Sequence, residues 1–286
     1  MQSMTIQPEC YDCLLRLVDL TVDLTAAPPE KQEQARSASL DIVRQEFRPG
    51  AIPAGIANLF HRAIRDLTGN PDPFSSRKNT ETAYLAHMHA RIAPSYSEDL
   101  DSLLRLAVVG NAIDFFREEE EVTREMLSQV NWTHNDLETF RRRLEGSGGL
   151  LLYLADNAGE QFFDLPLVTF LRGLGWQALY VVKGGPIQND LTREDLAASG
   201  LMDDLEPVAD TGARTVGLVL AETDAKFQKL YQEADLILAK GMGHFETMSH
   251  LHDPRLFFLL QAKCLPVARA LGVLKGSFIL RQALGS

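Results

Sequence analysis

Two acidic residues and one amide have the types and spacing of a divalent metal site. Asp156 and Asn157 follow the apolar run of residues 150–155, and Asp190 ends the polar segment of residues 183–190. Carboxylate and amide oxygens are hard ligands of the kind that Mg²⁺ and Mn²⁺ prefer, and three of them leave positions open for water or substrate. Such a metal ion polarises a phosphoryl oxygen and orients the attacking water. We therefore predict that Asp156, Asn157 and Asp190 hold a divalent metal ion that can act on a phosphoryl group.

A third polar segment, residues 240–246, follows another apolar run and starts with Lys240. An ammonium group at the end of a buried strand is costly unless it meets an anion, and Gly241 and Gly243 would let backbone N–H groups approach a phosphate. This pattern predicts that Lys240 binds a phosphate. The alternative is a lysine that reaches solvent from the sheet edge, with a glycine-rich turn behind it. His244 lies in the same segment and is a further candidate site residue.

Four polar residues near these strand ends also fit helix capping. Asn157 with Glu160, and Thr192 with Asp195, have the three-residue spacing of a capping box. The two predicted carboxylate ligands precede the cap positions, so capping does not explain them as readily. Both interpretations are compatible, because a helix N-terminus also attracts an anionic substrate.

Asn111 and Asp114 fall on or beside the apolar stripe of a predicted helix that includes Leu104 and Ala107. Buried polar groups need hydrogen-bond partners. The two side chains either bond neighbouring backbone or line a pocket at the junction of the two halves of the chain, where binding sites commonly lie. The sequence leaves both alternatives open.

The two halves of the chain differ in hydrophobic periodicity. From residue 10 to about residue 143, apolar residues recur at spacings of three and four, which predicts helices. After the glycine-rich residues 146–149, short apolar runs alternate with loops, which predicts buried and mostly parallel strands. Pro and Gly predict helix breaks at residues 26–30, 48–53 and 69–74. The predicted strands are residues 150–155, 178–182, 236–239 and, more weakly, 264–268, and the predicted crossover helix is residues 161–174.

We therefore predict an α/β protein with two domains. Residues 1–147 form a helical domain, and residues 148–286 form a Rossmann-like, three-layer α/β domain with a mostly parallel sheet. In an open α/β sheet, ligands bind beyond the carboxyl ends of the strands. The metal site therefore belongs to the second domain, where the three polar segments meet at one sheet edge.

Composition argues against several classes of partner. The chain of 286 residues has 28 Lys plus Arg against 39 Asp plus Glu, and its formal net charge of -11 repels nucleic acid and anionic membranes. No apolar run approaches the roughly 18 to 20 residues that span a bilayer. Glu9 and Asp12 lie where a signal peptide would be apolar, and 3 cysteines are too few for a disulfide scaffold. We expect a cytoplasmic protein that binds neither nucleic acid nor membrane, and the sequence indicates no oligomeric state.

Cys10 and Cys13 form a lone CxxC pair. Without a second pair at zinc spacing, the pair is a weak signal for a metal site. We favour apolar packing of these residues in the first helix.

Six motifs, in order along the chain, resemble the damage-control phosphatase family, formerly a domain of unknown function, and specifically its CxxC-containing archaeal and bacterial-type members. The motifs are Cys10-Tyr-Asp-Cys13, Gly69-Asn-Pro-Asp-Pro-Phe74, Gly110-Asn-Ala-Ile-Asp114, Asp156-Asn-Ala-Gly-Glu160, Pro186-Ile-Gln-Asn-Asp190 and Lys240-Gly-Met-Gly-His-Phe-Glu246. The resemblance covers nearly the whole chain, and several ordered motifs are far more specific than one.

The resemblance implies a metal-dependent phosphatase of sugar phosphates or damaged phosphometabolites, with a helical N-terminal part and a Rossmann-like C-terminal part. By motif match, Mn²⁺ or Mg²⁺, with Co²⁺ or Ni²⁺ as alternatives, would be held by Asp156, Asn157 and Asp190, and Lys240 would meet the phosphate. The residues around the substrate would be Asn111, Asp114, Glu160, Asn189, Gly241 and His244.

The chain departs from the family at His244-Phe245, where Asn-Tyr is common. A neutral His244 either replaces the hydrogen bond of the asparagine or adds a proton donor for the leaving alkoxide. We expect direct attack by metal-oriented water, because no Cys, Ser or His lies in a nucleophile motif and the DxD pattern of an aspartyl-phosphate enzyme is absent.

Two other functions are alternatives to a phosphatase. One is a non-catalytic module that binds a metal ion or a phosphometabolite, and turnover would distinguish it from an enzyme. The other is an AdoMet-dependent carboxyl methyltransferase. The sequence argues against the second, because Asp156-Asn-Ala-Gly-Glu160 and not a GxGxG-like loop follows the first predicted strand.

Overall fold

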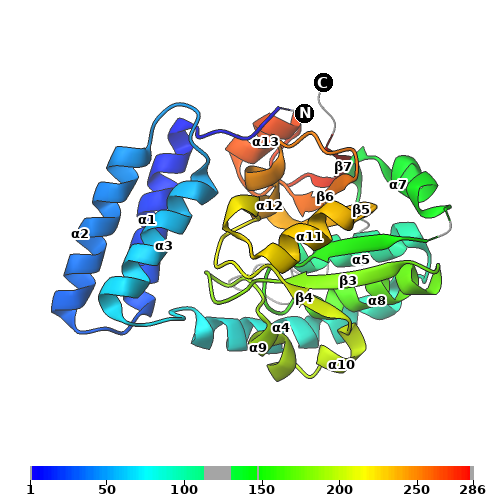
Figure 1. Cartoon of the computed structure of the whole chain (residues 1–286), viewed down its shortest axis with the longest axis horizontal. Helices are drawn as coiled ribbons and strands as arrows, with labels where there is room; N and C mark the ends of the chain where they lie inside the picture. Colours follow the sequence, from blue (N-terminus) through cyan, green and yellow to red (C-terminus); the bar gives the residue numbers. More distant parts are fainter. Residues whose placement is uncertain (1, 113–129, 147, 284–286) are drawn as a thin grey trace.

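The computed structural model describes residues 2–112, 130–146 and 148–283, and they form the predicted α/β protein. Figure 1 shows three long helices beside a sheet that has helices on both faces. These three helices are α1 (Pro8–Leu24), α2 (Pro29–Glu46) and α3 (Pro53–Thr68). Each has a proline in its first turn, where a missing N–H group is tolerated. The predicted breaks between them are confirmed.

One sheet of seven strands lies at the centre of the described residues, in the order β1-β7-β6-β5-β2-β3-β4. The strands from β6 through β5, β2 and β3 to the edge strand β4 run parallel to one another. At the other edge, β7 is antiparallel to β6 and parallel to β1. The mostly parallel sheet is therefore confirmed. The strands are β1 (Trp132–Asn135), β2 (Leu150–Leu154), β3 (Gln177–Val182), β4 (Val208–Asp210), β5 (Leu236–Lys240), β6 (Leu256–Gln261) and β7 (Phe278–Gln282).

Helices cover both faces of the sheet, as Figure 1 shows. Successive strand residues point to opposite faces, so Tyr153 packs into a core with α4, α5 and α8, whereas Leu152 and Leu154 pack into a second core with α11, α12 and α13. The predicted three-layer arrangement is confirmed. The remaining helices are α4 (Ser75–Ile92), α5 (Leu100–Ala112), α7 (Leu137–Leu144), α8 (Gln161–Gly173), α9 (Arg193–Ala198), α10 (Met202–Leu205), α11 (Ala225–Glu233), α12 (Gly241–Met248) and α13 (Leu265–Leu271), with 3₁₀ turns η1 (Ala93–Ser95) and η2 (Leu220–Glu222).

One predicted strand is wrong. Residues 264–268 begin helix α13, with Cys264 as an extended N-cap and Pro266 in the first turn, where proline favours a helix start. Such a short apolar run does not distinguish a strand from a helix. The strand of this region is β6, which the prediction missed together with β1, β4 and β7.

Elements on both sides of the predicted boundary near residue 147 contribute to the sheet and its layers. Strand β1 comes before residue 147, and α4 and α5 pack into the same core as α8. Helices α1 to α3 instead form a core of their own. The division into residues 1–147 and 148–286 stays a prediction.

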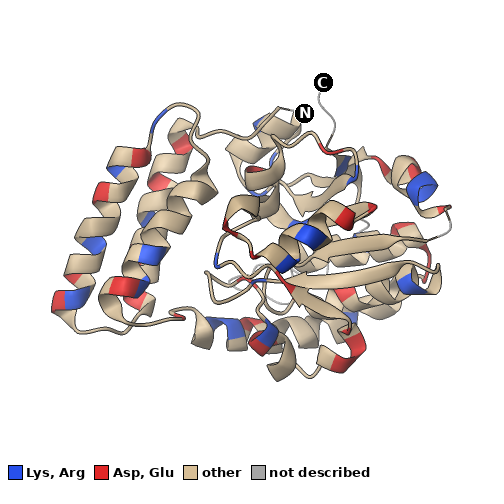
Figure 2. Cartoon of the chain, viewed as in Figure 1, with Lys and Arg blue, Asp and Glu red and all other residues tan. Residues whose placement is uncertain are grey.

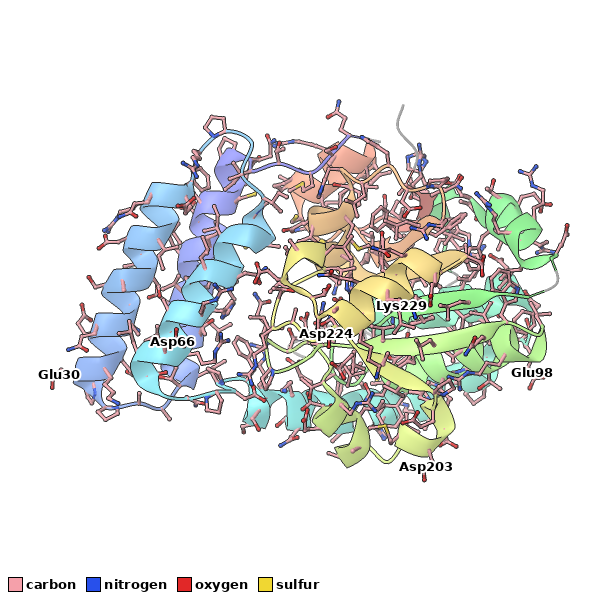
Figure 3. The ribbon with its side chains drawn as sticks, viewed as in Figure 1. Glu30, Asp66, Glu98, Asp203, Asp224 and Lys229 are labelled. Atoms are coloured by element: carbon pink, nitrogen blue, oxygen red, sulfur yellow. The ribbon has the colours of Figure 1, made fainter. Side chains whose placement is uncertain are left out.

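The charged surface is distinct from the sheet. Figure 2 shows both signs of charge spread over the outer helices, while the long strands carry little charge. Figure 3 shows Glu30, Glu98 and Asp203 at the periphery of the molecule. Among the helices that the structure describes, none combines the length and the apolar character of a membrane span.

Candidate active site

The three polar segments meet at the carboxyl end of the sheet, as predicted. They follow β2, β3 and β5, which are parallel, and β2 lies between the other two. Asn157 and Asp190 form an isolated antiparallel β-bridge, and the backbone N–H of Leu191 donates to Asp156 O at 2.8 Å. These bonds join the loop after β2 to the loop after β3. The structure thus brings the three predicted metal ligands together.

Two amides and two carboxylates form a cluster, which we call the carboxylate–amide cluster: Asn111, Asp156, Asn157 and Glu160. Asn157 Nδ2 donates to Asp156 Oδ2 at 2.9 Å and to Glu160 Oε1 at 2.7 Å. Asn111 Nδ2 donates to the same two oxygens at 2.8 and 3.0 Å. Because both NH₂ groups face carboxylates, both amide oxygens point away from them. Asn111 Oδ1 is buried and has no hydrogen-bond partner among the described residues.

The structure argues against the first alternative for Asn111: its side chain reaches the loop after β2 and bonds no backbone group among the described residues, while its place in a pocket stays a prediction. Asp114 lies outside the described residues. Its predicted position beside the substrate stays a prediction.

Only one of the two predicted capping boxes is formed. Thr192 and Asp195 bond each other reciprocally at the start of α9, with Asp195 N donating to Thr192 Oγ1 at 3.2 Å. Helix α8 begins later than expected for a cap at Asn157, and Glu160, at its N-cap position, makes no side-chain cap bond. Asn157 and Glu160 are therefore used by the cluster and not by a capping box.

Burial opposes ionisation of the acidic residues at this edge, and nearby lysines offset it to different extents. It raises the pKa of Asp156 well above its usual value, and the negative charges of Glu160 and Asp190 raise it further. Burial also raises the pKa of Asp190 to about 6, although Lys183 opposes the shift. For Glu160, burial is outweighed by the Lys240 ammonium, so its pKa is lowered. The three carboxylates thus compete for a limited positive charge.

Lys240, the last residue of β5, is fully buried. Its Nζ lies 2.7 Å from Glu160 Oε2 and 2.5 Å from Asp164 Oδ1. Asp164 also accepts hydrogen bonds from the hydroxyls of Tyr153 and Tyr180, each at 2.8 Å. Burial alone would lower the pKa of Lys240, but the two carboxylates outweigh it and raise the pKa. The alternative in which Lys240 reaches solvent is therefore wrong. An ammonium has three N–H groups, and the third has no acceptor among the described residues.

Lys183, just after β3, is a second buried lysine. Its Nζ donates to Gly217 O at 2.6 Å and lies 3.3 Å from Asp190 Oδ2 and 3.2 Å from His244 Nε2. His244 Nδ1 lies 2.6 Å from Lys240 O. Because a carbonyl oxygen only accepts, Nδ1 carries the proton and Nε2 accepts from Lys183.

Burial and the charge of Lys183 lower the pKa of His244 well below its usual value, so the ring is neutral. Its single N–H group already bonds a backbone carbonyl. The arrangement supports the alternative in which His244 is a neutral hydrogen-bonding group. Its contact with substrate stays a prediction.

Gly241 and Asn189 border the cluster in different ways. Gly241 has a φ of 81°, and a Cβ at this residue would lie 1.9 Å from Asp156 Oδ2, so glycine is required beside this carboxylate. Asn189 accepts a bond from Ala158 N at 2.8 Å through its carbonyl, while its Nδ2 donates to Glu81 Oε2 at 3.3 Å. The Asn189 side chain thus turns toward α4, and its predicted contact with substrate stays a prediction.

Sequence analysis missed two residues of this edge. Asp164 lies one helical turn after Glu160, a spacing that puts both side chains on one face of a helix. Lys263 follows β6, whose carboxyl end lies at the same edge. It is exposed, and its charge lowers the pKa of both Asp156 and Glu160. Recognition of residues 256–261 as a strand would have pointed to Lys263.

A divalent cation fits this edge by charge and by donor type. Four buried carboxyl groups (Asp156, Glu160, Asp164 and Asp190) face two buried lysines (Lys183 and Lys240), so the acidic groups outnumber the lysines by two. Within the described part of the chain, no three His, Cys, Asp or Glu side chains are arranged as a metal site. The predicted set differs from such a group, because one of its three ligands is an amide. The unpartnered oxygen of Asn111 is one more hard donor at this edge.

The fold and this edge define an α/β protein with a buried acidic site at the carboxyl ends of parallel strands. Residues 6–279 match the model of the damage-control phosphatase ARMT1-like domain, and the chain belongs to that family. The resemblance seen in the motifs is therefore confirmed.

Relatives of known name agree with this assignment. The chain is 34% identical to damage-control phosphatase PH1575 of Pyrococcus horikoshii, over 96% of this chain and 97% of that protein. It is 30% identical to a damage-control phosphatase of Archaeoglobus fulgidus, over 97% of this chain and 99% of that protein. The crystal structure of PH1575, described as a DUF89 family protein, matches with a TM-score of 0.87 and 31% identity, over 98% of this chain and 99% of that chain. These relatives support a phosphatase role in metabolite repair.

Proposed function

We propose that this protein is a metal-dependent phosphomonoester hydrolase of small phosphorylated metabolites. One observation carries the proposal: in a chain of a phosphatase family, the sheet edge gathers two more buried carboxylates than buried lysines. Burying charge without compensation is strongly unfavourable, so this excess favours a bound divalent cation.

Asp156, Asn157 and Asp190 would hold the metal ion. Their oxygens suit Mn²⁺ or Mg²⁺, with Co²⁺ and Ni²⁺ as alternatives. When bound, the ion would supply Lewis-acid chemistry, which polarises a phosphoryl oxygen and lowers the pKa of water. The unpartnered oxygen of Asn111 is available to the ion or to a hydroxyl group of the substrate.

The remaining residues of the edge bind and orient. Glu160 accepts hydrogen bonds from the NH₂ groups of Asn111 and Asn157, so the amide oxygens of both residues point away from the carboxylates. The third N–H group of Lys240 and the exposed ammonium of Lys263 would bind the phosphate, because both cations lie at the edge that carries the carboxylates. Charge-assisted hydrogen bonds of this kind are the stronger class.

A screen of metals against substrates tests the proposal. The native protein should release phosphate from an aryl phosphate with at least one of Mn²⁺, Mg²⁺, Co²⁺ and Ni²⁺. Asp156→Ala and Asp190→Ala should each lower that activity by at least about 100-fold, because each removes a metal ligand. Asp203→Ala is the matched control, since Asp203 is exposed on α10 and should leave the activity unchanged.

Retained activity in both ligand variants would contradict the assigned metal site. If the native protein released no phosphate with any of the four metals, the non-catalytic binding module would be favoured instead. A phosphorylated enzyme trapped by acid quench would overturn direct attack by water.

A further inference from the structure

Two arginines from distant parts of the chain lie against the loop after β3 and form no ion pair with an acidic residue that the structure describes. Arg65 is on α3, and Arg214 is in the segment between β4 and η2. Neither guanidinium group makes an ion pair or a hydrogen bond with any described residue. Two neighbouring guanidinium groups without a described carboxylate partner are unusual in a protein whose formal net charge is -11.

The geometry of the loop brings the two arginines together. Arg65 lines a narrow cleft with Pro186, Ile187 and Gln188. The Arg214 side chain lies over Gly185, where a Cβ would be 2.4 Å from Arg214 Nε and 2.9 Å from its Cγ. Glycine at this position therefore allows Arg214 to lie against the loop. The two side chains thus border neighbouring residues of the same loop from two different parts of the chain.

The loop is also held against α3 by a hydrogen bond between half-buried Gln188 and buried His61. Gln188 Nε2 lies 2.9 Å from His61 Nε2, and Gln188 has a left-handed φ of 45°. Burial lowers the pKa of His61 to about 3, so the ring is neutral and its Nε2 accepts the hydrogen bond from Gln188. This contact keeps the loop, and with it the cleft beside Arg65, in one position.

The electrostatics of the pair favour an anion. Burial lowers the pKa of Arg65, and the charge of Arg214 lowers it further, while Asp66 opposes the shift. Two cations that repel each other without a counterion are stabilised by a ligand that binds both. The guanidinium fork matches phosphate and carboxylate groups, and such charge-assisted pairs are frequently bidentate.

The arginine pair is connected to the carboxylate–amide cluster through short stretches of chain. Asp190 comes two residues after Gln188, and Lys183 comes two residues before Gly185. Gly217, whose carbonyl accepts from Lys183, comes three residues after Arg214. An anion bound by the arginines would therefore lie on the loops that also hold the metal ligand Asp190.

We propose that Arg65 and Arg214 form a subsite for a second anionic group of the substrate. The inference rests on the proposed phosphatase function and narrows its substrate class: small metabolites that carry a phosphoryl group at one end and another phosphate or carboxylate at the other. The first group is hydrolysed at the carboxylate–amide cluster, and the second is bound by the two arginines.

Steady-state kinetics with three phosphoesters test the subsite. They are a sugar bisphosphate, a phosphorylated hydroxy acid and an aryl phosphate without a second anionic group. For each protein, the ratio of kcat/KM for the first two esters to kcat/KM for the aryl ester is the measured preference. Arg65→Gln and Arg214→Gln should each lower the preference about tenfold, through KM, because each removes a hydrogen bond to a charged group. Arg65→Lys should fall between native and Arg65→Gln.

Arg62→Gln is the matched control, since Arg62 lies on the same helix but pairs with Glu222 at 2.8 Å, and it should leave the preference unchanged. A larger loss for the bisphosphate assigns the subsite to phosphate, and a larger loss for the hydroxy acid assigns it to carboxylate. An unchanged preference in both arginine variants would overturn the inference.

A second measurement separates failure of the subsite from failure of the proposed function. If no ester is hydrolysed by the native protein, phosphatase activity fails, and the subsite is tested by binding. Calorimetric titration with inorganic phosphate should then show a Kd that rises about tenfold in the double variant Arg65→Gln/Arg214→Gln. Equal phosphate binding by native and double variant would reject the subsite.

Discussion

The two buried lysines at the sheet edge differ in the groups that compensate their positive charge. Lys240 has two carboxylates within 2.7 Å. Lys183 has one carboxylate at 3.3 Å, and its other acceptors are the neutral groups Gly217 O and His244 Nε2. The charge of Lys240 is therefore compensated by carboxylates of the protein itself. Asp190, beside Lys183, is only partly compensated, and so it is the carboxylate better suited to receive a cation.

Removal of the two ammonium groups should separate the two cases most clearly. Lys240→Met should lower the free energy of unfolding by about 3–5 kcal/mol, because it leaves Glu160 and Asp164 buried without their counterion. Lys183→Met should cost less, about 1–3 kcal/mol, because most of what it removes is hydrogen bonding to neutral groups. Urea unfolding of metal-free protein at neutral pH measures both.

Lys229→Met is the control for these two variants. Lys229 is exposed on α11, labelled in Figure 3, and its ion pair with Glu233 is long, at 3.7 Å. Its replacement should change the free energy of unfolding by no more than about 0.5 kcal/mol. If Lys240→Met and Lys183→Met lowered the free energy of unfolding equally, the two lysines would not differ in their compensation.

Asp190, beside Lys183, and Glu160, beside Lys240, should contribute pH dependences of opposite sign to the free energy of unfolding. Burial raises the pKa of Asp190 from 3.8 to about 6, so the folded protein holds this proton more tightly than the unfolded chain. The contribution of Asp190 is complete below pH 3.8 and is lost as the pH rises through about 6. This loss amounts to roughly 3 kcal/mol in the free energy of unfolding.

Glu160 acts the other way. Its pKa is lowered from 4.5, so its contribution is complete above that value and is lost as the pH falls. Urea unfolding of metal-free native protein, Asp190→Asn and Glu160→Gln from about pH 4 to about pH 7 tests the contrast. In Asp190→Asn, the free energy of unfolding should fall less between acid and neutral pH than in native protein. In Glu160→Gln, it should fall less as the pH is lowered toward about 4. Changes of the same sign in both variants would refute the assignment.

The smallest effect should come from the hydroxyl groups that support Asp164. Tyr153→Phe removes one of the hydrogen bonds to this carboxylate, so it should lower the free energy of unfolding by about 1–2 kcal/mol. Tyr11→Phe is the control, because Tyr11 packs edge-on against Phe47 and no hydrogen bond of its hydroxyl occurs among the described residues. A Tyr153→Phe protein as stable as the control would mean that the hydrogen bond from the Tyr153 hydroxyl to Asp164 does not stabilise the protein.

The sequence predicted the meeting of the loops better than the pairing of the side chains. Strong apolar runs marked β2, β3 and β5, and the rule for parallel strands then put Asp156, Asp190 and Lys240 at one edge. The run at residues 264–268 was too short to identify a helix, and the missed strand β6 concealed Lys263. Which carboxylate pairs with Lys240 depends on side-chain positions far apart in the chain, and periodicity does not report them.

The bridge between Asn157 and Asp190 has a consequence for kinetics. The two loops are joined by main-chain hydrogen bonds, which fix the backbone of the proposed ligands Asp156, Asn157 and Asp190. If these residues hold a cation as we propose, its capture would require little ordering of the chain, and preorganised sites lose little affinity to entropy. Association should be limited by shedding of water from the ion, and the loops after β2 and β3 should keep their positions during capture.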